Sequence, residues 1–155
     1  MENKSACTTD YRTLEHLLAE GKWFDADVET AKKICEIMGR KKEGWLRVED
    51  IKNFPYKDLA IIDKLWLQYS NGQFGFSVQK RIWLECGGEP GIYNDTAWNN
   101  FGEKVGWRVN NYWLHYSEIN FSHHANAGHL PRVEKVLVWW CGLGFGWSLL
   151  SRSDF

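Results

Sequence analysis

The first two thirds of the chain alternate between amphipathic stretches and glycines. Apolar residues recur three or four positions apart, the spacing that places them on one side of an α-helix. A glycine follows each stretch, as is common at helix C-termini. The pattern predicts five helices, whose apolar faces include Leu14 and Leu18, Ile34 and Ile37, Leu59 and Trp66, Val78 and Trp83, and Trp98 and Phe101. The first two helices, which end at Gly21 and Gly39, are expected to form an αα-hairpin.

Side chains that can accept a hydrogen bond from free helix amides mark the expected helix starts. Thr9 or Asp10 is expected to cap the first helix, Asp58 to open the third, Ser77 to cap the fourth, and Asp95 or Thr96 to start the fifth. This pattern predicts a helical structure for the chain up to Gly106.

Beyond Gly106 the helical periodicity ends. Residues 107–114 predict a small hairpin around Asn110-Asn111. Val136–Leu150 carries no charge, but this segment is shorter than the ~20 residues of a membrane helix. Its glycines, spaced two apart, argue against a regular helix. We therefore expect a buried or interfacial C-terminal segment.

The chain contains ten tryptophans, eight phenylalanines and six tyrosines in 155 residues, more aromatic surface than one small core requires. Trp66 and Trp83 lie on helical apolar faces and are expected in the core. Trp45, Trp107 and Trp113 lie in stretches rich in Gly, Asn or charge, which predict loops. Aromatic side chains exposed on loops are typical of a binding surface, here for a flat conjugated ligand.

Length and charge exclude several classes of protein. The chain is expected to form one domain over 1–155, with a flexible N-terminus at 1–9. Nineteen basic and twenty acidic residues give no electrostatic footprint for nucleic acid. The four cysteines lack metal-binding spacing and are expected to be free thiols. The N-terminal residues show no secretory or transit pattern, so a cytoplasmic location is expected. The chain is also expected to be a monomer.

Catalytic and metal motifs do not stand out. Four histidines fall between His115 and His129 without the framework of a zinc site, and His129 is interpreted as a structural turn residue. No nucleophile elbow, phosphate-binding loop or dinucleotide fingerprint is present, so the chain is interpreted as a non-enzyme. Cations beside the loop aromatics suit the carboxylates of a planar ligand; the alternative is that they are solvated loop charges. These cations are Arg40, Lys41, Lys42, Arg108 and Arg132.

A series of motifs along nearly the whole chain resembles the genomes-uncoupled-four family. The most specific stretch is Ser70-Asn71-Gly72-Gln73-Phe74-Gly75-Phe76. Others, in order, are Gly21-Lys22-Trp23, Ala26-Asp27, Gly44-Trp45-Leu46, Asn53-Phe54-Pro55, Val105-Gly106-Trp107-Arg108 and Gly128-His129-Leu130-Pro131.

The resemblance implies an all-α fold: a single compact domain of short helices, shaped like a cupped hand, with two long loops that form the ligand site. Family members bind protoporphyrin and magnesium protoporphyrin, stimulate magnesium chelatase and engage its large subunit without being catalysts; some bind bilins. The two loops correspond to 40–54 and 107–132. The resemblance assigns ligand-binding roles to Leu46, Val48, Phe54, Trp107, Trp113, Tyr116 and Phe121, with Arg40, Arg108 and Arg132 as propionate partners.

Two departures from the family pattern keep alternatives open. We expect the chain to lack the additional N-terminal helical bundle of chelatase-activating cyanobacterial members, and His123-His124 replaces unpaired polar residues. The alternatives are a bilin- or haem-binding sensor, in which a histidine of this pair could ligate a metal, and a helical interaction module without a ligand. The resemblance suits a cyanobacterial cytoplasm, with peripheral membrane contact through the apolar C-terminal segment.

Overall fold

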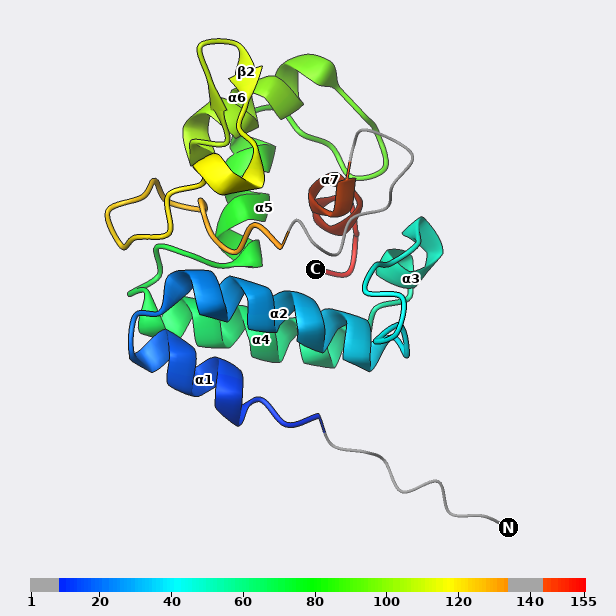
Figure 1. The fold of residues 1–155 in the computed structure, drawn as a ribbon. Coiled ribbons are helices and arrows are strands. Elements are labelled where there is room, and N and C mark those ends of the chain that lie inside the picture. The colour runs from blue at the N-terminus through cyan, green and yellow to red at the C-terminus, as the bar shows by residue number, and fades with distance from the viewer. Residues whose placement is uncertain (1–8, 134–143) are drawn as a thin grey trace.

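The computed structural model describes residues 9–133 and 144–155, so residues 1–8 of the expected flexible N-terminus lie outside it. The fold is mostly helical, as predicted (Figure 1). Its helices are α1 (Arg12–Ala19), α2 (Trp23–Ile37), α3 (Val48–Lys52), α4 (Tyr56–Tyr69), α5 (Phe76–Glu85), α6 (Asp95–Val105) and α7 (Gly144–Leu150). Two-residue strands β1 (Arg108–Val109) and β2 (Tyr112–Trp113) and a 3₁₀ turn, η1 (Tyr116–Glu118), complete it.

α1, α2 and α4 pack together along one side of the molecule, and α5, α6 and the hairpin lie on the other (Figure 1). The Trp66 indole joins α4 to α2, donating a 3.0 Å hydrogen bond to the Thr30 hydroxyl. That hydroxyl donates to the Ala26 carbonyl, so the buried polar groups of Trp66 and Thr30 both have partners. Trp66 and Trp83 are fully buried, which confirms their prediction as core residues.

All five predicted helices are present; α6 begins at Asp95, as predicted, but α1, α4 and α5 begin at other positions than predicted. α4 begins at Tyr56, two residues before Asp58, because Pro55 supplies a backbone angle already suited to a helix start. Gly75 precedes α5 with φ +143°, and an added Cβ would lie 2.8 Å from an Asp63 carboxylate oxygen. The Ser77 amide instead donates to that carboxylate. Asn94 caps α6 through the Ala97 amide.

At α1 the N-cap residue is Tyr11, whose side chain makes no capping bond. The predicted Asp10 nevertheless accepts a 3.0 Å hydrogen bond from the Arg12 amide.

The predicted hairpin is confirmed. Arg108 pairs with Trp113 and Val109 with Tyr112 in an antiparallel register. Asn110 and Asn111 both have positive φ, 51° and 65°, the arrangement of a two-residue hairpin turn. This hairpin positions the loop that continues through η1 to residue 133.

α3 and α7 were not predicted. α7 is helical despite Gly144 and Gly146, which contradicts the argument from glycine spacing. Leu149 and Leu150 are buried, as expected of the C-terminal segment, and residues 134–143 lie outside the described residues. The Arg152 guanidinium donates to the carbonyls of Ile51 and Phe54, at 3.2 and 2.7 Å, and so ties the chain after α7 to α3. Within 9–133 and 144–155, no helix is long and apolar enough to span a membrane.

Candidate functional site

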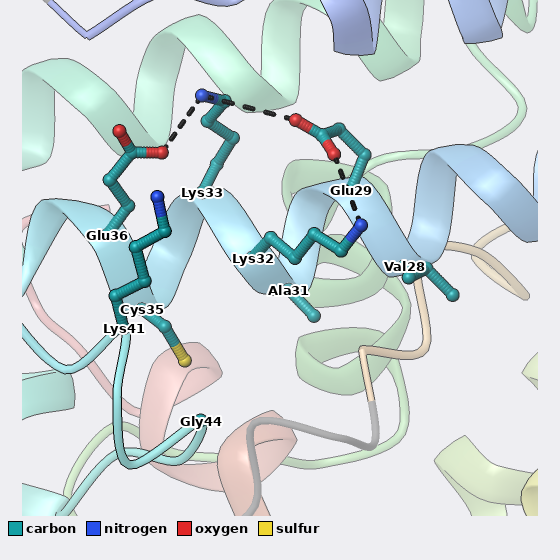
Figure 2. Close-up of a pocket in the computed structure, with 9 residues that line it drawn as sticks. All are labelled: Val28, Glu29, Ala31, Lys32, Lys33, Cys35, Glu36, Lys41 and Gly44. Atoms are coloured by element: carbon teal, nitrogen blue, oxygen red, sulfur yellow. Dashed lines mark hydrogen bonds and ion pairs between the residues drawn. The ribbon is translucent and has the colours of Figure 1, made fainter.

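A cavity of about 640 Å³ opens along one side of α2; we call it the α2 groove. Its volume falls within the range of small-molecule sites. Its lining residues are Val28, Glu29, Ala31, Lys32, Lys33, Cys35 and Glu36 from α2, with Lys41 and Gly44 from the following loop (Figure 2).

The apolar floor of the α2 groove follows from helical spacing. Val28, Ala31 and Cys35 are three and four positions apart, so their side chains leave the same side of α2, as Figure 2 shows. The adjacent side carries Thr30 and Ile34, which are buried in the core, and Ala31 and Cys35 are themselves almost fully buried. Small side chains on the groove side leave space where larger ones would fill it.

Burial raises the pKa of the Cys35 thiol above its usual range, which the nearby Arg40 only partly offsets. The thiol is therefore protonated at neutral pH and contributes apolar surface rather than a nucleophile.

Three lysines border the groove, and they differ in how available their ammonium groups are to bind an anion. Lys33 is held between Glu36, at 3.0 Å, and Glu29, at 4.0 Å. The Lys32 side chain is 69% exposed and only 3.9 Å from Glu29, a contact too loose to fix it. Lys41 is exposed and makes no ion pair with any residue in the described part of the chain. Lys32 and Lys41 are therefore the cations available to carboxylates of a bound molecule.

An aromatic cluster lies at the N-terminal end of α2, one turn before Val28. Phe24, which is 48% exposed, packs edge to face on Phe121 with ring centroids 5.1 Å apart. The Tyr116 ring completes the cluster, 5.4 Å from Phe121 and 6.1 Å from Phe24. The predicted residues Tyr116 and Phe121 are thus brought together beside α2.

Asp27 fixes this cluster to α2. Its buried carboxylate accepts hydrogen bonds from the Tyr116 hydroxyl, at 2.7 Å, and from the amides of Arg132, at 2.6 Å, and Val133, at 3.1 Å. Burial raises the pKa of Asp27, and these hydrogen bonds oppose that shift. Val133 has φ +42°, a strained angle for a β-branched residue. The Asp27 carboxylate therefore holds both the loop after the hairpin and a strained backbone segment.

The prediction that Trp107 is an exposed loop aromatic is wrong. Only 2% of its surface is exposed. Its indole donates a 2.8 Å hydrogen bond to the His129 carbonyl, and its ring packs edge to face on Phe101. The segment around His129 folds back over the start of the hairpin and covers the indole, a contact that local composition does not reveal.

The other predicted tryptophans and apolar residues are also dispersed. Trp113 is half-buried and stacks on Trp98, with centroids 5.8 Å apart. Trp45 is exposed, as predicted, beneath the Arg40 guanidinium. Leu46 and Phe54 are buried in the core, and Val48 is half-buried at the start of α3. None of these side chains lines the α2 groove.

The three predicted arginines do not converge on one point. Arg40 lies 3.5 Å from Glu43 and 3.8 Å from Asp50. Arg108 is paired with Glu103. The Arg132 guanidinium lies over the Trp107 ring, 4.5 Å from its centroid. Sequence reasoning missed Val28, Ala31, Lys32 and Cys35, whose only signal was small or polar residues at helical spacing beside a loop.

The prediction of a structural His129 is confirmed. Its Nδ1 donates to the Val105 carbonyl at 2.6 Å, and its Nε2 accepts from the Asn120 amide at 3.1 Å, which fixes the neutral tautomer. Burial lowers the pKa of His129. The rings of His123 and His124 are 3.9 Å apart. Among the described residues, no group of three or more His, Cys, Asp or Glu side chains could hold a metal.

Comparisons with known proteins give a consistent result. A family profile described as GUN4-like matches residues 4–144. An uncharacterized ycf53 protein of Pyropia yezoensis is 36% identical over 136 residues, covering 86% of this chain and 54% of the relative. The chain thus spans about half the length of the first curated relatives it matches.

A sequence match and a structural match from Arabidopsis thaliana extend the comparison. A chloroplastic tetrapyrrole-binding protein of Arabidopsis thaliana is 37% identical over 79 residues, covering 50% of this chain and 30% of that protein. The solved ligand-free structure of Arabidopsis thaliana GUN4 superimposes with a TM-score of 0.76 at 27% identity, covering 96% of this chain and 99% of that one.

Proposed function

The chain belongs to the GUN4-like family, and on that premise we propose that it binds a tetrapyrrole, protoporphyrin or its magnesium complex, in the α2 groove. The observation that carries the proposal is the groove itself. An apolar floor of small side chains accepts a flat ring, and Lys32 and Lys41 at its border can pair with propionates. The aromatic cluster of Phe24, Tyr116 and Phe121 adds ring surface at the end of α2.

The proposal changes which residues are expected to contact the ligand. Tyr116 and Phe121 remain candidates, because they lie beside α2. The anion partners become lysines rather than Arg40, Arg108 and Arg132, because the arginines are engaged elsewhere.

A non-catalytic regulatory role completes the proposal. The name of the Arabidopsis relative supports tetrapyrrole binding. We extend it to regulation of magnesium chelatase through the large subunit of that enzyme, with residues 1–155 acting as one monomeric binding domain. Titration of chelatase activity with this protein, with and without saturating porphyrin, tests the extension.

Spectroscopic titration tests binding itself. Protoporphyrin should quench tryptophan emission and shift its own Soret band at micromolar concentrations, which correspond to about −8 kcal/mol. Val28→Phe, at a half-buried position that lines the groove, reduces its volume and should weaken binding about tenfold or more; Val109→Phe, at an exposed position outside the groove, is the control. Equal affinities of the two variants would place the ligand elsewhere. Binding of haemin or phycocyanobilin in preference to both porphyrins would instead support the sensor alternative.

A further inference from the structure

A second groove runs between α4 and α5 and shares no residue with the α2 groove; we call it the α4–α5 groove. It encloses about 600 Å³. Its lining residues are Tyr56, Ala60, Asp63, Lys64 and Leu67 from α4, Ser77, Lys80, Arg81, Leu84 and Glu85 from α5, and Phe155. Neither the predicted ligand site nor the proposed function uses any of these residues.

The groove exposes large apolar side chains from both helices. Tyr56, Ala60 and Leu67 lie four and seven positions apart, so they form one stripe along α4. Leu84 faces them from α5. Tyr56 is 54% exposed and Leu84 is 45% exposed, although both lie at helical positions that could have carried polar residues. A contiguous apolar surface with a polar rim is typical of an interaction site.

The charge at the rim is mainly positive. Lys64 is exposed and makes no ion pair with the residues that the structure describes. Lys80 donates to the Arg152 carbonyl, a neutral acceptor, and also interacts with the nearby Asp154 carboxylate. Among the acids, Asp63 is buried and accepts from the Ser77 amide, and Glu85 lies 3.9 Å from both Arg81 and Lys104. The rim therefore favours an acidic partner.

We propose that the α4–α5 groove docks an acidic amphipathic helix of a partner protein. The apolar face of that helix packs on Tyr56, Leu67 and Leu84, and its flanking carboxylates meet Lys64 and Arg81. A second copy of this chain is a poorer occupant, because twofold pairing would bring two positive rims together. A flat lipid surface would leave the floor between the helices uncovered.

A pair of synthetic helical peptides tests the proposal in the full chain. Each has about four turns with Leu at i, i+3, i+4 and i+7, flanked by Glu in one peptide and by Lys in the other. The Glu peptide should bind with micromolar affinity at low salt, measured by fluorescence anisotropy. Leu84→Glu and Lys64→Glu should each weaken binding about tenfold. Ile92→Glu and Lys42→Glu, matched changes at exposed positions outside the groove, should leave affinity unchanged.

A charge reversal separates specific docking from nonspecific adhesion. The Lys64→Glu/Arg81→Glu variant should prefer the Lys peptide, with melting curves confirming that the variants fold. The proposal is overturned if the wild-type protein binds neither peptide, or binds both equally. It is also overturned if phosphatidylglycerol vesicles, but not the Glu peptide, bind in a manner that Leu84→Glu abolishes. A dimer seen by sedimentation and lost in Leu84→Glu would assign the groove to a second copy instead.

Discussion

The Tyr116 hydroxyl donates a 2.7 Å hydrogen bond to the Asp27 carboxylate across 89 positions of sequence. Asp27 lies on α2, one turn after the helix begins, and Tyr116 is the first residue of η1, in the loop after the hairpin. The same carboxylate accepts the amides of Arg132 and Val133. The buried Asp27 carboxylate thus holds two separate segments of the loop, at Tyr116 and at residues 132–133, against the helix that lines the α2 groove.

Removing the Asp27 carboxylate should lower the free energy of unfolding more than removing the Tyr116 hydroxyl. Asp27→Ala leaves a hydroxyl and two amides without their acceptor, and each buried unsatisfied group costs about 1–3 kcal/mol. We expect a loss of at least ~3 kcal/mol in the free energy of unfolding, measured with denaturant, against ~1 kcal/mol for Tyr116→Phe. Tyr112→Phe, on the exposed strand β2, is the control. A smaller loss in Asp27→Ala than in Tyr116→Phe would contradict this role.

Trp107→Ala should destabilise the domain, and its effect should not be limited to weaker ligand binding. The mutation opens a cavity beneath the His129 segment and removes the indole donor, which together cost about 3–5 kcal/mol. Trp45→Ala, at an exposed position, should cost less than about 1 kcal/mol. Thermal melts of the two variants make the comparison, and equal melting temperatures would show that Trp107 is not a core residue.

The contrast between Trp107 and the predicted core tryptophans shows what the sequence could and could not predict. Trp66 and Trp83 lie on long periodic helices, where spacing alone identifies the buried face. Burial of Trp107 depends on a carbonyl 22 positions later, and no local pattern carries that information. The family resemblance identified the overall fold, but not which loop side chains face solvent.

α3, α7 and the α2 groove also depend on contacts between residues far apart in the sequence, so local patterns did not predict them. α3 has five residues, too few to show a helical period, and Arg152 donates to the Ile51 carbonyl in its last turn and to the Phe54 carbonyl just after it. Glycine spacing argued against α7, yet its C-terminal leucines are buried against the fold. The α2 groove is defined by small side chains and by a loop that returns beside the helix, features that a hydrophobicity pattern does not encode.

The stability of the domain should fall as the solution is acidified through the range in which free histidine protonates. Burial holds the pKa of His129 below its ordinary value of about 6.5, so at intermediate pH the unfolded chain binds a proton that the folded chain does not. The contribution of neutral His129 is therefore present above about pH 6.5 and is lost as pH falls below it.

Denaturant unfolding between about pH 7.5 and about pH 5.5 measures this slope. His129→Gln should flatten it, although the variant is less stable at every pH because the contacts with Val105 and Asn120 change. An unchanged slope in His129→Gln would show that other groups cause the acid sensitivity.

Lysines, rather than the arginines predicted from the sequence, should recognise the acidic groups of the ligand. Lys32 and Lys41 border the α2 groove and are exposed, whereas Arg108 is held by Glu103. The Lys32→Gln/Lys41→Gln variant should bind free-acid protoporphyrin about tenfold more weakly, a loss of about 1.4 kcal/mol. Its affinity for the dimethyl ester should change little, because the ester offers no anion to pair with. Arg108→Gln is the control, and a larger loss of acid binding in that variant would return the propionate site to the hairpin.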